Sequence, residues 1–60
     1  MKYFNQLVEV KDLCDNKQYR KADKLINQVY ESQLKNHDMI QEERNEMYLL
    51  IKRISNKIHG

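Results

Sequence analysis

The stretch QLKNHDMIQ (residues 33–41) decides the fold of this chain. On both sides of it, apolar side chains recur every three or four residues, a spacing that places them on one face of a helix. The polar residues 36–38 interrupt this pattern. Asp38 followed by Gln41 matches a capping box, in which two side chains satisfy backbone N–H groups at the start of a helix. We therefore expect a turn at 36–38.

The alternative is one long helix over residues 19–58, which would make the protein a helical hairpin. The apolar heptad phase of the segment before the turn continues in the segment after it: Ala22, Ile26 and Val29, then Ile40, Met47, Leu50 and Ile54. A phase that is kept across the polar stretch is what an uninterrupted helix would also produce.

Three segments, 2–15, 18–35 and 39–58, each have one apolar face. The faces consist, in order, of Tyr3, Phe4, Leu7, Val10 and Cys14; of Tyr19, Ala22, Leu25, Ile26, Val29, Tyr30 and Leu34; and of Ile40, Met47, Leu50, Ile51, Ile54 and Ile58. Polar residues 15–18 separate the first segment from the second, and Asn16 can adopt the left-handed conformation that ends a helix. The pattern predicts three helices.

Composition narrows the fold class further. The chain has 60 residues, no proline, and one glycine at the last position, so hairpin turns and phosphate-binding loops lack their usual residues. A chain of this length hides only about 60% of its unfolded surface, which limits it to one small core. We expect a single all-α domain over 1–60, a small three-helix antiparallel bundle.

The charges are nearly balanced along the chain but unevenly placed. Eleven basic residues face nine acidic ones, a net charge of +2. In an up-down-up bundle, two basic clusters meet at one end: Lys17, Arg20, Lys21 and Lys24, with Lys52, Arg53 and Lys57. The opposite end collects Glu31, Asp38, Glu42, Glu43 and Glu46. A small net charge therefore conceals a dipolar surface, which is either ordinary solvated helix surface or a docking site.

Candidate chemistry is sparse. His37 and His59 have no second ligand at metal-binding spacing, so we expect no metal and no cofactor. Cys14 lies on an apolar face, without a neighbouring base, so we expect no catalysis. A single thiol suits a reducing cytoplasm, and the longest apolar run, Tyr48 to Ile51, is too short for a membrane span. Abundant Lys, Asn and Ile fit an AT-rich bacterial or phage genome.

Tyr48 and Leu49 lie beside the apolar face of the third segment rather than on it. Apolar residues beyond such a face are typical of an interface, although single exposed hydrophobes are common. Pairing of two chains through this segment would bury both residues and the isoleucine row. We therefore expect a homodimer.

The sequence favours a small non-enzymatic regulator, adaptor or inhibitor that binds another protein through a helix face and the basic end. The alternative is a dimeric nucleic-acid-binding regulator whose bases contact phosphates, and the small net charge makes it the weaker hypothesis. The candidate partner-binding residues are Lys17, Arg20, Lys21, Lys24, Tyr48, Leu49, Lys52, Arg53 and Lys57, and the nucleic-acid hypothesis uses only the seven bases among them.

Overall fold

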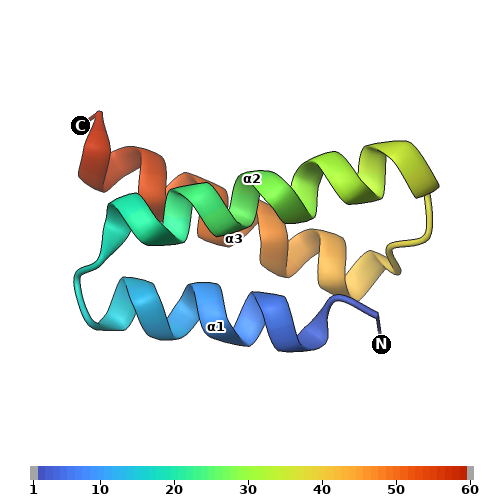
Figure 1. Cartoon of the computed structure of the whole chain (residues 1–60), viewed down its shortest axis with the longest axis horizontal. Helices are drawn as coiled ribbons and strands as arrows, with labels where there is room; N and C mark the ends of the chain where they lie inside the picture. The colour runs from blue at the N-terminus through green and yellow to red at the C-terminus, as the bar shows by residue number, and fades with distance from the viewer. Residues whose placement is uncertain (1, 60) are drawn as a thin grey trace.

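A computed structural model describes residues 2–59, which contain three helices and no strand. Helices α1 (Phe4–Asp15), α2 (Tyr19–Asn36) and α3 (Gln41–Ile58) run up, down and up, and each packs against the other two (Figure 1). The predicted three-helix bundle is confirmed, with helix bounds within two residues of those expected. The single long helix over 19–58 is wrong.

Two residues in the left-handed region make the turns. Lys17 has φ 63° and His37 has φ 52°, a conformation that costs a non-glycine residue about 1 kcal/mol. His37 ends α2 as a left-handed cap, so the expected turn at 36–38 is confirmed. In the first turn the left-handed residue is Lys17 rather than Asn16. Asn16 keeps a negative φ, and its side-chain amide donates to the carbonyl of Asp12 at 2.9 Å.

The predicted capping box at Asp38 and Gln41 is absent. The residue at the N-cap position of α3 is Ile40, which has an extended backbone (ψ 161°), and not Asp38. No side chain caps this helix start. The connection is instead closed by Arg44, whose Nη2 donates to the carbonyl of Met39 at 3.1 Å. Asp38 is thereby left to bond with the start of the chain.

The core lies along the axis shared by the three helices. Most of its members come from the predicted apolar faces: Tyr3, Leu7, Val10, Cys14, Ala22, Ile26, Val29, Met39, Met47, Leu50 and Ile54. The prediction of a core position is wrong for three residues, since Phe4, Leu34 and Ile40 are about half exposed. Ile40 lies outside the first turn of α3, and its neighbour Met39 fills the core in its place.

Tyr3 joins the start of α1 to the other two helices. Its side chain is 2% exposed, and its backbone N–H donates to Oε2 of Glu43, on α3, at 2.9 Å. Its hydroxyl donates to Oδ1 of Asp38 and lies 3.3 Å from Oγ of Ser32 on α2. Lys2 forms an ion pair with the same aspartate. One buried tyrosine thus bonds to α2, to α3 and to the connection between them.

We predict that Tyr3→Phe lowers the free energy of unfolding by about 1 kcal/mol, because the buried ring stays while the hydroxyl bond to Asp38 is lost. Urea unfolding followed by circular dichroism measures this difference. Tyr48→Phe is the matched control, since the half-exposed Tyr48 hydroxyl makes no hydrogen bond within residues 2–59. Equal stability of the two variants would contradict the role of Tyr3.

The Asp38 carboxylate makes stability depend on pH. Hydrogen bonds from Lys2, and next from Tyr3, hold the pKa of Asp38 below its ordinary value of 3.8. The stabilisation is complete above that ordinary pKa and is lost as the pH falls through the lower pKa of the folded state. The stability difference between the native chain and Asp38→Asn should therefore shrink between about pH 5 and about pH 2. A difference that is constant in urea titrations over this range would contradict the assignment.

Candidate functional site

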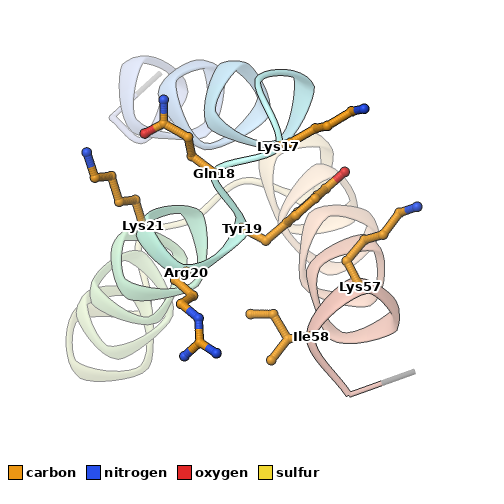
Figure 2. Close-up of a pocket in the computed structure, with 7 residues that line it drawn as sticks. All are labelled: Lys17, Gln18, Tyr19, Arg20, Lys21, Lys57 and Ile58. Carbon is orange, nitrogen blue, oxygen red and sulfur yellow. The ribbon is translucent and has the colours of Figure 1, made fainter.

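A basic pocket lies where the turn between α1 and α2 meets the end of α3. Its volume is about 450 Å³, and its lining is Lys17, Gln18, Tyr19, Arg20, Lys21, Lys57 and Ile58 (Figure 2). The structure thus brings together four of the seven predicted basic residues, from two segments that are far apart in the sequence.

The side chains in this pocket divide into groups. The ring of Tyr19 points toward the side where Lys17 and Lys57 lie, and its hydroxyl is directed between their amino groups (Figure 2). Arg20 extends beside the apolar side chain of Ile58, and Lys21 points to the other side of α2. In this view the Lys17 and Lys57 amino groups and the Tyr19 hydroxyl lie on one side of the pocket, and Arg20 and Ile58 lie on the other (Figure 2).

The start of α2 has an unfavourable charge arrangement for a helix. Its first turn contains no acidic residue, and the residue before it, Gln18, makes no side-chain capping bond. Arg20 and Lys21 instead place positive charge at the end where the helix dipole is already positive. Helix α3 follows the favourable order, with Glu42 and Glu43 in its first turn and Lys57 in its last. A bound anion would relieve the repulsion at the start of α2.

The other predicted site residues lie outside the pocket. Lys24 and Lys52 are exposed, on α2 and α3 respectively. Arg53 is engaged within the chain, because its Nη2 donates to Oδ1 of Asp15 at 2.9 Å. That bond raises the pKa of Arg53. Tyr48 and Leu49 are 50% and 64% exposed on α3.

A second pocket, which the sequence analysis missed, lies between α1 and α3. Its volume is about 400 Å³, and its lining is Phe4, Leu7, Val8, Lys11, Glu42, Glu43 and Glu46. The prediction of an exposed acidic end is wrong for Glu43, which is only 2% exposed. Asp38 contributes less free charge than expected, because it is paired with Lys2. A signal for the buried glutamate was present, since Glu43 precedes Met47, Leu50 and Ile54 by four, seven and eleven residues.

The sequence singled out Cys14 and the two histidines as the candidates for chemistry. Cys14 is 1% exposed, and burial raises the pKa of its thiol, which opposes formation of the nucleophilic thiolate. Between residues 2 and 59, no three histidine, cysteine or acidic side chains are grouped so that they could hold a metal ion. No helix in that range has the length and apolar character needed to cross a membrane.

Comparison of the chain with models of known protein families, with curated proteins and with solved structures gave no match in any of the three.

Proposed function

We propose that this chain is a non-enzymatic binding protein, a regulator or adaptor, that recognises an acidic segment of another protein in the pocket at the start of α2. The observation that carries the proposal is the pair Lys17 and Lys57 on either side of the Tyr19 hydroxyl. Neither lysine forms an ion pair within residues 2–59. Two ammonium groups without an ion pair in that range, on the same side of the pocket as a hydroxyl donor, suit an acidic segment, and Ile58 across the pocket suits an apolar residue elsewhere in that segment.

A protein partner is favoured over nucleic acid by the size and composition of the pocket. A nucleic-acid surface distributes unpaired bases along several phosphates. Here Arg53 is bound to Asp15, and the cations that remain at the pocket cover one end of a bundle 19 × 16 Å across. The lone free thiol, Cys14, is compatible with action in a reducing cytoplasm.

The strain at Lys17 permits a test that separates binding from folding. Lys17→Gly removes one cation but supplies the residue that best tolerates φ 63°. We expect stability to be kept or raised, while the affinity for the peptide acetyl-Leu-Glu-Asp-Leu-amide falls about threefold, as for loss of one exposed ion pair. Chemical shifts of the backbone amides of 17–21, 57 and 58 report the binding.

The control is His37→Gly, which relieves the same backbone conformation in the other turn, at the opposite end of the bundle. It should leave the affinity for the acidic peptide unchanged. Equal affinities of the two variants would overturn the proposal. Retention of a short DNA duplex at about 50 mM salt, with affinity falling linearly in log salt, would support the nucleic-acid alternative instead.

Pairing of two copies through α3 stays a prediction, on a smaller surface than the sequence suggested. Ile54 is buried, and Ile51 and Ile58 are partly buried against the core, so little of the isoleucine row is available to a second copy. What α3 presents is Tyr48 and Leu49.

Sedimentation equilibrium at micromolar concentration should give about 15 kDa, from two chains of 7.4 kDa. Leu49→Gln should return the mass to that of one chain. Leu34→Gln is the control, because Leu34 is also about half exposed but lies on α2. A clean monomer for the native chain would refute the dimer.

A further inference from the structure

The pocket between α1 and α3 combines an apolar floor with an excess of negative charge. Phe4 and Val8, 53% and 41% exposed, supply apolar surface from α1. Three glutamates of α3 line the other side, against one ammonium group from Lys11. Glu42 and Glu46 are exposed and one helical turn apart, so both carboxylates border the same pocket.

Glu43 is the second, independent observation at this pocket. Its side chain lines the pocket, and only 2% of the residue is exposed. Its Oε2 accepts the bond from the N–H of Tyr3, whereas its Oε1 is buried without any hydrogen-bond partner. A buried carboxylate oxygen without a donor is costly, and its field acts through a low dielectric. Among residues 2–59, no side chain or backbone group donates to Oε1 of Glu43.

We propose that this pocket binds a basic segment of a partner protein, in which a lysine or arginine side chain is flanked by apolar residues. The cation would lie among the three glutamates, and its apolar neighbours would cover Phe4 and Val8. Charge complementarity selects this occupant, because an acidic or purely apolar segment would leave the glutamates unpaired. The site lies near the start of α1 and α3, at the end of the bundle opposite Lys17 and Lys57 (Figure 1).

The test is a chemical-shift titration of the full chain with three peptides: acetyl-Leu-Arg-Leu-amide, acetyl-Ala-Arg-Ala-amide and acetyl-Leu-Glu-Leu-amide. The first should shift the amide signals of Phe4, Val8 and Glu46 at millimolar concentration. The second lacks the apolar neighbours and the third lacks the cation, so both should bind at least about fivefold more weakly when the affinity is read from the Phe4, Val8 and Glu46 signals alone. Absence of shifts with the first peptide, or equal binding of all three, would overturn the proposal.

Variants locate the site on the chain. Glu46→Gln should weaken binding of the first peptide about twofold, as for loss of one exposed charge. Glu43→Gln keeps an acceptor for the Tyr3 N–H and should weaken binding about fivefold, because a buried charge is screened less. Glu31→Gln, an exposed glutamate on α2, makes the same charge change outside the pocket and should have no effect.

Two results would assign the pocket differently. An equal loss of affinity in the Glu31 variant would show that net charge alone drives binding. Shifts of Phe4 and Val8 that depend on protein concentration without peptide would identify a second copy as the occupant. Either result overturns the basic-segment proposal, and neither depends on whether the pocket at Lys17 and Lys57 binds an acidic peptide.

Discussion

The packing of the bundle depends on the bonds made by Tyr3. The three-helix bundle has a small core, to which α1 contributes Leu7, Val10 and Cys14, and the start of α1 has further partners through Tyr3. Tyr3 supplies a buried ring, a backbone N–H bonded to Glu43 and a hydroxyl bonded to Asp38. These bonds span 40 and 35 residues of sequence, and they hold the start of α1 against the α2–α3 connection and the first turn of α3.

Because the chain has no internal glycine, a non-glycine residue adopts the left-handed conformation in each turn, which costs free energy at Lys17 and at His37. His37 takes the left-handed conformation where α2 ends, which is the usual use of that conformation. Lys17 takes it just before α2 begins, and the helix that follows starts with two further bases and no acid. Neither the backbone conformation of Lys17 nor the positive charge at the start of α2 stabilises the fold. Features that lower stability are typical of functional sites, and we therefore expect function at the start of α2.

The sequence predicted the helices and most of the core because both depend on local periodicity. It placed the three helices within two residues and found ten of the eleven buried apolar residues that the structure shows, all except Met39. It failed where a contact is made across the fold. Asp38 looks like a helix cap by spacing, yet its partners are Lys2 and Tyr3. The basic pocket followed from topology, whereas the α1–α3 pocket required knowing that Glu43 is turned inward.

The two pockets have opposite charge and lie at opposite ends of a molecule 29 Å long. At that separation, exposed charges interact little across physiological salt, where the Debye length is about 8 Å. The charges of one pocket therefore do little to neutralise those of the other, and the two proposed binding sites are independent of each other. If both proposed sites bind, one an acidic and the other a basic segment, the chain joins two partners at opposite ends, which is the role of an adaptor rather than of an inhibitor that covers a single target.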